Sequence, residues 1–374
     1  MMTRQPHTFS IPSSNRLPIT LITAVVVLSG CSRETPAPVT PPPSVARDDG
    51  PAPEPEKPAL TASELRRRLG ARDVARFTKT GNQFVEAYLA ESGVTDLTPL
   101  KDHPIKVLDL TRTPVTDLAP IAGLPIENLG LSETKVTDLR PLSTMPLTSL
   151  SMKGVPVDSL APLMELQLTA LDASETKVSD LSPLVGMPLG ALYLESTQVA
   201  DLSPLRDTPL KQLYLNKTAV TDLSPLAGKT MSELNLCDTA VADLGPLGNA
   251  RIGILWLRNT KVTNLGPAEA LELTSLDLQG TAVSDLGPLG RMATIERLNI
   301  AETDVTDLRP LASLRLSRLI LTPSKIKDGL EIIRAMPSLT QLDVRFEEDA
   351  TPRTPEQFWA DFDAGKFKPG TSDR

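Results

Sequence analysis

Leucines recur along most of this chain at a fixed spacing, and polar residues fill the positions between them. Residues 189–209 read LGALYLESTQVADLSPLRDTP, and residues 210–230 read LKQLYLNKTAVTDLSPLAGKT. Both follow the pattern L-x-x-L-x-L-x-x-T-x-V-x-D-L-x-P-L. In the L-x-L centre, alternate side chains point to opposite faces, as in a β-strand with one buried face. Each unit therefore predicts a short strand, followed by a tight turn at D-L-x-P-L that leaves no room for a full helix.

The pattern repeats with a period of 21 residues over most of residues 84–346. Units begin at Phe84, Ile105, Ile126, Leu147, Leu168, Leu189, Leu210, Met231, Ile252, Leu273, Ile295 and Leu316, and a last strand is predicted within 339–344. A period of about 20 to 29 residues with this leucine spacing is typical of a leucine-rich repeat. We therefore predict a repeat solenoid, a right-handed superhelix with a parallel β-sheet on its concave face. Short 3-10 or irregular turns are expected on the convex face, and helical caps at both ends.

Polar residues at two positions of the unit form columns along the solenoid. The Thr column includes Thr197 and Thr218, whose hydroxyls are expected to bond the backbone of adjacent turns. The Asp column includes Asp201 and Asp222, whose carboxylates are expected to accept a backbone N–H at the turn. A calcium ladder is the less favoured alternative, because calcium needs about six oxygens at one point and the column offers one carboxylate per turn. The sequence thus predicts no metal site and no cofactor.

The two ends of the array depart from the repeat. Residues 60–83 are predicted as an N-terminal helical cap, because Thr61 and Glu64 have the spacing of a capping box. Residues 347–374 are predicted as a C-terminal helical cap and tail, because a second capping box, TPEQ, begins at Thr354. Terminal repeats need caps because each inner turn covers the apolar face of its neighbour.

The first residues of the chain have the pattern of a targeting segment. Arg4 and Arg16 carry positive charge, and residues 17–28 are apolar but too few to span a bilayer as a helix. The sequence LSGC, ending at Cys31, resembles the lipobox of bacterial lipoproteins, in which the chain is cleaved before the cysteine and the thiol takes a lipid. The resemblance implies that residues 1–31 are a lipoprotein signal peptide. The alternative is an ordinary signal peptide with a chance cysteine.

Residues 32–59 are rich in proline and have no apolar periodicity, which predicts a disordered tether. Ser32 resembles the sorting signals that favour the outer membrane. We therefore expect a protein that is lipid-anchored in the cell envelope, at the periplasmic or surface face. If Cys31 carries the lipid, Cys237 is either a free thiol or the partner of a cysteine in another molecule.

Charge and residue usage argue against two classes of function. The net charge is −8 with scattered Lys and Arg, which disfavours nucleic acid and leaves the lipid as the expected contact with the membrane. After the signal segment the only histidine is His103, and Cys237 has no histidine at a matching position. The sequence therefore shows no catalytic pair or zinc cluster, and we predict that the protein is not an enzyme.

The outward positions of the predicted strands carry the aromatic residues. All three tyrosines and one of the two tryptophans lie between the core leucines of a unit, and Tyr193, Tyr214 and Trp256 cluster within four turns. Aromatic residues with arginine on an open surface are typical of a binding hot spot, although Tyr also suits any exposed strand position. The predicted ligand-binding residues are Tyr193, Tyr214, Trp256, Asn235, Asp277, Glu195, Asn216, Arg258 and Gln279. We expect the three aromatic side chains to be exposed, so that their replacement by Ala costs little stability.

The array resembles the short, internalin-like leucine-rich repeats with a DLSPL turn. It is also similar to repeat regions of planctomycete and related bacterial proteins that are sometimes attached to serine/threonine kinases. The segments LTPSKIKDGLEIIRAMPSL (321–339) and PEQFWADFDAGKF (355–367) carry this second resemblance, which covers about residues 61–369. It implies the repeat fold and its caps. The sequence has no kinase Gly-rich loop, His-Arg-Asp or Asp-Phe-Gly motif.

These observations predict a lipid-anchored envelope protein that binds a protein or peptide partner through its concave face. One alternative is a structural envelope scaffold without a dedicated ligand. Another is a binder of polysaccharide or peptidoglycan, because Tyr and Trp also stack on sugars.

Overall fold

The computed structural model describes residues 60–346 and 351–367. The chain divides into two units, Met1–Leu60 and Thr61–Arg374, and the second carries the repeat array. The signal peptide with Cys31 and the tether, predicted within residues 1–59, lie outside the described residues.

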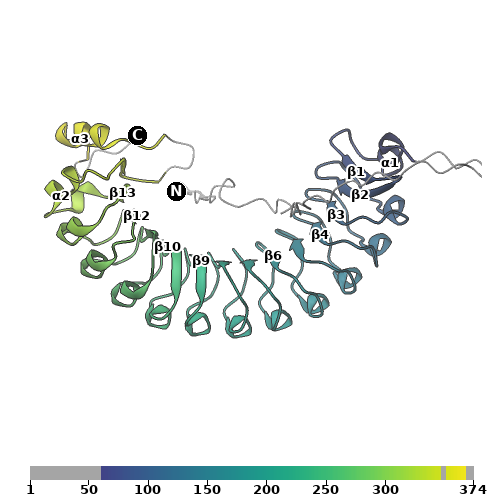
Figure 1. The fold of residues 1–374 in the computed structure, drawn as a ribbon, viewed down its shortest axis with the longest axis horizontal. Helices are drawn as coiled ribbons and strands as arrows, with labels where there is room; N and C mark the ends of the chain where they lie inside the picture. Colours follow the sequence, from purple (N-terminus) through teal and green to yellow (C-terminus); the bar gives the residue numbers. More distant parts are fainter. Residues whose placement is uncertain (1–59, 347–350, 368–374) are drawn as a thin grey trace, which may run out of the picture. The chain divides into compact units, whose positions relative to one another are not determined.

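One β-sheet runs through every turn of the array. Its 14 strands follow one another in sequence order. They are β1 (Arg76–Thr80), β2 (Gln83–Tyr88), β3 (Val107–Asp109), β4 (Asn128–Gly130), β5 (Ser149–Ser151), β6 (Ala170–Asp172), β7 (Ala191–Tyr193), β8 (Gln212–Tyr214), β9 (Thr230–Asn235), β10 (Arg251–Trp256), β11 (Ser275–Asp277), β12 (Arg297–Ile300), β13 (Arg318–Leu321) and β14 (Gln341–Asp343). β1 pairs antiparallel with β2, and every later pair is parallel. Within this unit the strands line the concave side of an arc (Figure 1), which confirms the predicted leucine-rich repeat solenoid.

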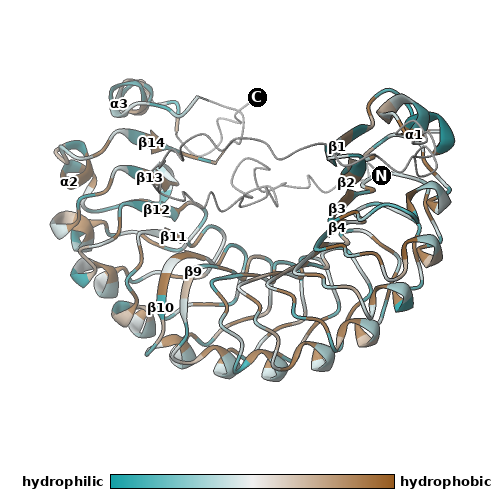
Figure 2. Ribbon diagram, turned by 45° about the vertical axis from the view of Figure 1, so that its right-hand side comes forward, coloured by the Kyte–Doolittle hydropathy of each residue, from teal (hydrophilic) through white to brown (hydrophobic). Residues whose placement is uncertain are grey.

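Strand pairing aligns equivalent positions of successive turns. Leu192 pairs with Leu213, which pairs in turn with Leu234, and all three are 0% exposed. Apolar residues recur in this way from turn to turn (Figure 2). Each buried leucine contributes roughly 1.5–3 kcal/mol of hydrophobic free energy. The core is therefore a continuous column of leucine side chains that stabilise the array by similar amounts.

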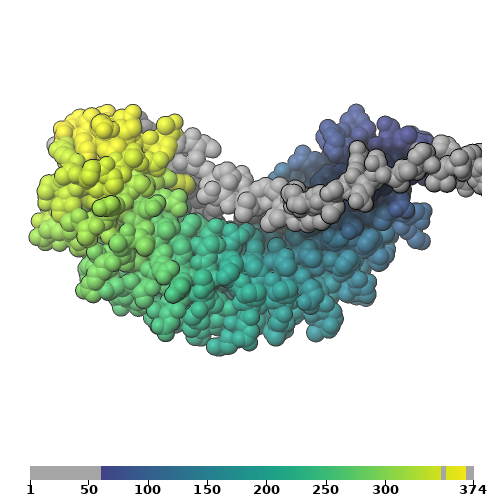
Figure 3. Space-filling model, viewed as in Figure 1, coloured from purple at the N-terminus to yellow at the C-terminus, as the bar shows by residue number. Residues whose placement is uncertain are grey.

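Short 3-10 helices form the convex side, and the turns stack in sequence order (Figure 3). They are η1 (Thr98–Leu100), η2 (Ala119–Ile121), η3 (Arg140–Leu142), η4 (Ala161–Leu163), η5 (Ser182–Leu184), η6 (Ser203–Leu205), η7 (Ser224–Leu226), η8 (Gly245–Leu247), η9 (Gly266–Ala270), η10 (Gly287–Arg291), η11 (Arg309–Ser313) and η12 (Pro323–Lys325). Each has proline in its first two positions, where the missing N–H has no helical partner to lose.

The Asp column holds these turns, as predicted. Asp201 Oδ1 accepts the N–H of Ser203 at 2.8 Å, and Asp222 does the same for Ser224. The same bond from the N–H two residues on is accepted by Asp96, Asp117, Asp138, Asp180, Asp243, Asp285 and Asp307, by Asn264, and by the hydroxyl of Ser159. The turn-capping interpretation of this column is therefore confirmed.

The Thr column has a different partner from the one expected. Thr197 Oγ1 donates to the carbonyl of Leu194 at 2.7 Å, and Thr218 donates to that of Leu215 at 2.6 Å. Both carbonyls lie three residues earlier in the same turn, so the prediction of bonds to adjacent turns was wrong. The chain bends back directly after the strand, so the nearest acceptor for the buried hydroxyl is a carbonyl of its own turn.

That corner depends on a residue in the left-handed region, immediately before the Thr position. Ser196 has a φ of 57° and Lys217 one of 59°. The other non-glycine residues of this kind are Glu91, Arg112, Glu133, Glu175, Asp238, Asn259 and Glu302. Glycine occupies the same position in two turns, as Gly154 and Gly280, with φ values of 70° and 69°. Elsewhere the side chain has a Cβ and adopts this conformation at a cost, so a pattern built on the apolar positions did not predict it.

The N-terminal cap combines a helix with a strand. Helix α1 (Ala62–Arg68) begins with the predicted capping box of Thr61 and Glu64. The sequence predicted only the helix, whereas the structure adds β1, which pairs with β2. Most side chains of β1 are exposed, so its sequence lacks the alternation of apolar and polar residues that indicates a strand. Its pairing with the edge of β2 through backbone bonds holds it in place.

The C-terminal cap is built on helices α2 (Leu330–Arg334) and α3 (Pro355–Asp363). The predicted capping box at Thr354 is present. Phe358 is 0% exposed and Trp359 9%, and the guanidinium of Arg334 lies 4.5 Å from the centre of the Trp359 ring. The carbonyl of Arg353 accepts the N–H of Leu342, so this segment also covers the open edge of β14.

Candidate functional site

Three aromatic side chains form a row on the concave face, which we call the aromatic row: Tyr193 of β7, Tyr214 of β8 and Trp256 of β10. Pairing places Tyr193 beside Tyr214, and their ring centres are 4.9 Å apart. Tyr214 and Trp256 have ring centres 5.8 Å apart although β9 runs between their strands. Neighbouring strands are about 4.8 Å apart, so two strand spacings are about 9.6 Å. The two rings therefore lean toward each other across β9.

Asn235 of β9 lies between these two strands and is 0% exposed. Its Oδ1 accepts the backbone N–H of Cys237 at 3.0 Å. Its Nδ2 has no hydrogen-bond partner among the described residues. The aromatic row thus covers a polar amide whose donor group is not satisfied within the array.

Tyr214 is 3% exposed, while Tyr193 and Trp256 are half-buried. The expectation of three exposed aromatic side chains was therefore wrong for Tyr214. A period-two pattern predicts the face to which a side chain points, but not how far the rings on neighbouring strands cover it.

The tyrosine hydroxyls are held by two residues that the sequence did not single out. Tyr193 Oη donates to Gln212 Oε1 at 3.2 Å, and Gln212 Nε2 donates to Glu233 Oε1 at 3.1 Å. Tyr214 Oη donates to Glu233 Oε2. Burial, and then the bond to the Glu233 carboxylate, raise the pKa of Tyr214 above its ordinary value. Gln212 and Glu233 could have been found, because residues two apart on a strand share a face.

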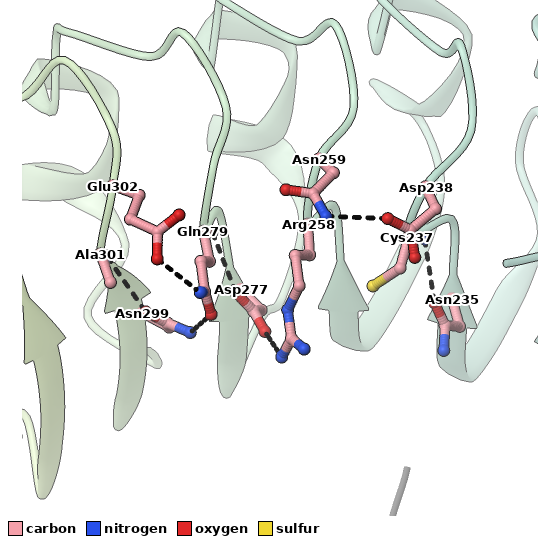
Figure 4. A network of polar contacts seen from close by, with 10 residues as sticks. All are labelled: Asn235, Cys237, Asp238, Arg258, Asn259, Asp277, Gln279, Asn299, Ala301 and Glu302. Atoms are coloured by element: carbon pink, nitrogen blue, oxygen red, sulfur yellow. Dashed lines mark hydrogen bonds and ion pairs between the residues drawn. The ribbon is translucent and has the colours of Figure 1, made fainter. Parts of the chain in front are cut away.

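An ion pair continues the site beyond Trp256 (Figure 4). Arg258 Nη2 lies 2.8 Å from Asp277 Oδ2, and their side chains are 20% and 11% exposed. Asp277 Oδ1 accepts the N–H of Gln279 at 3.0 Å. Gln279 in turn donates to Glu302 at 3.2 Å and accepts from Asn299 at 3.3 Å.

Asn235 and Asp277, both predicted as ligand-binding residues, also hold the backbone at the ends of their strands. Each accepts the backbone N–H of the residue two further along, just past the end of its strand. Asp109, Asp172 and Asn299 make the same bond in other turns. One oxygen of each side chain is therefore committed to the fold, because the backbone N–H at the strand end needs an acceptor.

The register places the remaining predicted residues, Glu195 and Asn216, beside the aromatic row. Glu195 is 5% exposed, and Asn216 Oδ1 is a buried acceptor without a hydrogen-bond partner among the described residues. The structure thus brings the predicted residues onto one face over β7 to β11. Direct contacts link them as two groups, the aromatic row and the Arg258–Asp277 pair.

Cys237 and His103 are the two residues considered for catalysis, and both lie in packed surroundings. Cys237 is a buried free thiol whose pKa burial raises to about 12, with the Asp277 charge adding to the shift. Such a thiol stays protonated near neutral pH and is a poor nucleophile. His103 packs edge-on against Phe84 with ring centres 5.1 Å apart. Within residues 60–346 and 351–367, no three His, Cys, Asp or Glu side chains are grouped to hold a metal ion.

The sequence matches no protein-family model and no curated protein. Solved structures do match. An internalin of Listeria monocytogenes is 24% identical, with a TM-score of 0.64 over 75% of this chain and 87% of that chain. A leucine-rich repeat protein of Leptospira interrogans is 18% identical, with a TM-score of 0.52 over 73% and 80%. The chain has an internalin-like leucine-rich repeat fold.

A leucine-rich repeat structure from a plant also matches this chain. The leucine-rich repeat ectodomain of the Arabidopsis thaliana membrane receptor kinase GASSHO1/SCHENGEN3 is 15% identical, with a TM-score of 0.55 over 78% of this chain and 42% of that chain. That structure is a complex with CASPARIAN STRIP INTEGRITY FACTOR 2. At these identities the likeness is one of fold. In the part of the chain that the structure describes, no helix is long and apolar enough to cross a membrane.

Proposed function

We propose that this protein binds a protein or peptide partner on its concave face, at the aromatic row and the adjoining Arg258–Asp277 pair. The observation that carries the proposal is the contact of Tyr214 and Trp256 over Asn235. Rings that already pack against each other lose little rotamer freedom on binding, and Tyr, Trp and Arg dominate binding hot spots. The comparison lends support, because leucine-rich repeat neighbours such as the plant ectodomain are seen with protein or peptide ligands.

The dimensions favour an extended segment of the partner. From β7 to β11 there are four strand spacings, or about 19 Å. An extended chain rises about 3.3 Å per residue, so roughly six residues would cross the site. The largely buried Arg258–Asp277 pair at one end offers polar partners to such a segment, and the aromatic row offers apolar surface.

Photo-crosslinking in native envelopes tests this function. A crosslinker placed at Lys211, an exposed position directly before β8, should capture a defined protein. Adding Tyr193→Ala together with Trp256→Ala should weaken capture by about 1,000-fold, since hot-spot residues contribute about 2 kcal/mol each and each 2 kcal/mol is about 30-fold. Tyr88→Ala, in the same column but on β2, is the matched control and should leave capture unchanged. An unchanged crosslinking profile in the row variant would favour the scaffold, and binding of peptidoglycan fragments would favour the glycan alternative.

We also propose that a lipid on Cys31 holds the protein in the cell envelope, with the internalin-like array presented beyond the Pro-rich tether. The apolar segment followed by LSGC supports this proposal. Metabolic labelling with a palmitate analogue should mark the parent protein and not Cys31→Ala, whereas Cys237→Ala should label normally. Label on Cys31→Ala would show that the lipobox interpretation is wrong.

A further inference from the structure

The N-terminal cap concentrates positive charge in a chain that is acidic overall. Residues 60–83 hold six basic and two acidic side chains, a net charge of +4, whereas the whole chain carries −8. The basic residues are Arg66, Arg67, Arg68, Arg72, Arg76 and Lys79. The rest of the chain therefore carries −12. The net charge of the whole chain disfavours an anionic surface as partner. That single value does not show that the positive charge is concentrated in the cap.

The cap presents several of these charges to solvent. Arg66 holds the cap together, since its Nη2 donates to the Ala75 carbonyl at 3.1 Å and so ties α1 to the following loop. Arg67 and Arg68 on α1, and Arg72 on the loop, are exposed. None of these three has an ion-pair partner among the described residues. Their charge is therefore available to an outside anion.

An exposed apolar side chain lies in the same loop. Val74, between Arg72 and Arg76, is 52% exposed. Only two other large apolar side chains are comparably exposed in the described residues, and both follow convex 3-10 helices of the array, Met164 after η4 and Val185 after η5. Asp73, the acid next to Val74, lies 4.0 Å from Arg66 Nη1 and is partly neutralised by it. An apolar tip in a loop with excess arginine suits the boundary between lipid headgroups and acyl chains.

We propose that this basic cap, consisting of Arg67, Arg68, Arg72 and the Val74 tip, docks on an anionic lipid surface. The arginines pair with headgroup phosphates, and Val74 enters the interface. A lipid surface fits better than a soluble polyanion, because a polyanion gains nothing from Val74. The inference builds on the proposed anchor, because the cap is the first described element after the tether and a lipid on Cys31 would hold it near the same membrane.

Vesicle sedimentation tests the cap without the anchor. The chain from Ser32 to Arg374 lacks the apolar leader and Cys31 but keeps the whole compact unit from Thr61 onward. It should bind vesicles with 30% phosphatidylglycerol and not vesicles of phosphatidylcholine alone, and 0.5 M NaCl should release it. Arg67→Gln with Arg68→Gln should weaken binding about 30-fold, at about 1 kcal/mol for each charge near the surface. Arg206→Gln with Lys217→Gln, two exposed cations of the array, is the matched control and should bind like the parent.

Each outcome separates the alternatives. Val74→Ser should weaken vesicle binding several-fold while leaving the melting temperature unchanged. Equal binding to both kinds of vesicle, or equal loss in the array control, would overturn the proposal. Loss on Arg67→Gln with Arg68→Gln but none on Val74→Ser would show that charge alone carries the binding, which overturns the role of Val74 and with it the preference for a lipid surface over a soluble polyanion. If vesicle binding holds while Cys31 takes no palmitate, only the anchor fails.

Discussion

Tyr214 and Trp256 lie on strands that are not neighbours, yet their ring centres are 5.8 Å apart, because both rings lean across Asn235. This contact turns separate outward side chains into one packed surface. A surface that is ordered before binding loses less conformational entropy when a partner arrives. The same contact buries Tyr214, which gives this residue a structural role beside its proposed binding role.

Substitutions in the aromatic row should therefore differ in their effect on stability. Tyr214→Ala is expected to lower the free energy of unfolding by about 3 kcal/mol, because it empties a buried site. Tyr214→Phe should cost about 1 kcal/mol through the lost bond to Glu233. Tyr193→Ala, at a half-buried position, should cost about 1 kcal/mol. Urea unfolding followed by circular dichroism measures all three, and equal losses for Tyr193→Ala and Tyr214→Ala would contradict the packing described above.

The left-handed backbone conformation of Ser196 predicts which side chains this position tolerates. Ser196→Val should lower stability by roughly 1–3 kcal/mol, because a β-branched residue is strained at positive φ. Ser196→Gly should be neutral or stabilising, because glycine adopts this conformation without strain. Gln198→Val, two residues on and also exposed, is the control and should change stability little. Thermal melts of the three variants provide the measurement, and a Val as well tolerated as Gly would argue against the corner.

The Asp column predicts sensitivity to acid. The bonds that Asp138 accepts, first from the Arg140 side chain and then from its N–H, lower its pKa to about 2. The bonds from Ser203, side chain first, likewise lower the pKa of Asp201. A carboxylate whose pKa is lower in the folded than in the unfolded chain stabilises the fold above about pH 4, and this contribution is lost as the pH falls through the folded pKa.

We therefore expect the urea midpoint to fall between about pH 4 and pH 2. Asp138→Asn with Asp201→Asn should flatten this dependence, because Asn keeps the acceptor oxygen without titrating. Asn264 already caps its turn in this way, accepting the Gly266 N–H at 2.9 Å. An unchanged pH profile in the double variant would mean that these caps do not cause the acid sensitivity.

The C-terminal cap should be required for solubility. Deleting residues 351–374 removes Phe358 and Trp359 and uncovers the edge of β14, where Leu342 now donates to the Arg353 carbonyl. An open edge and an apolar end favour association, so the shortened protein should aggregate in size-exclusion chromatography with light scattering. Deleting only residues 368–374, which leaves α3 intact, is the control. A monomeric 1–350 chain with an unchanged melting temperature would show that the segment is not a cap.

The sequence by itself determined the features that depend on short range or on strict repetition. Leu192 and Leu213 occupy the same position of two units, so the period fixed both their burial and their pairing. Asp201 bonds a residue two positions away, which local spacing reveals. The capping boxes at Thr61 and Thr354 were predictable for the same reason.

Only the tertiary structure decided which outward side chains touch. The partners in the concave site come from different turns, such as Tyr214 with Glu233 and Arg258 with Asp277, each 19 residues apart. The period places such residues on one face, but the lean of each side chain depends on the size and charge of its neighbours on the next strand. The left-handed corner and the strand β1 were hidden for a related reason. They are fixed by backbone geometry and backbone bonds, which the hydrophobic pattern of the side chains does not encode.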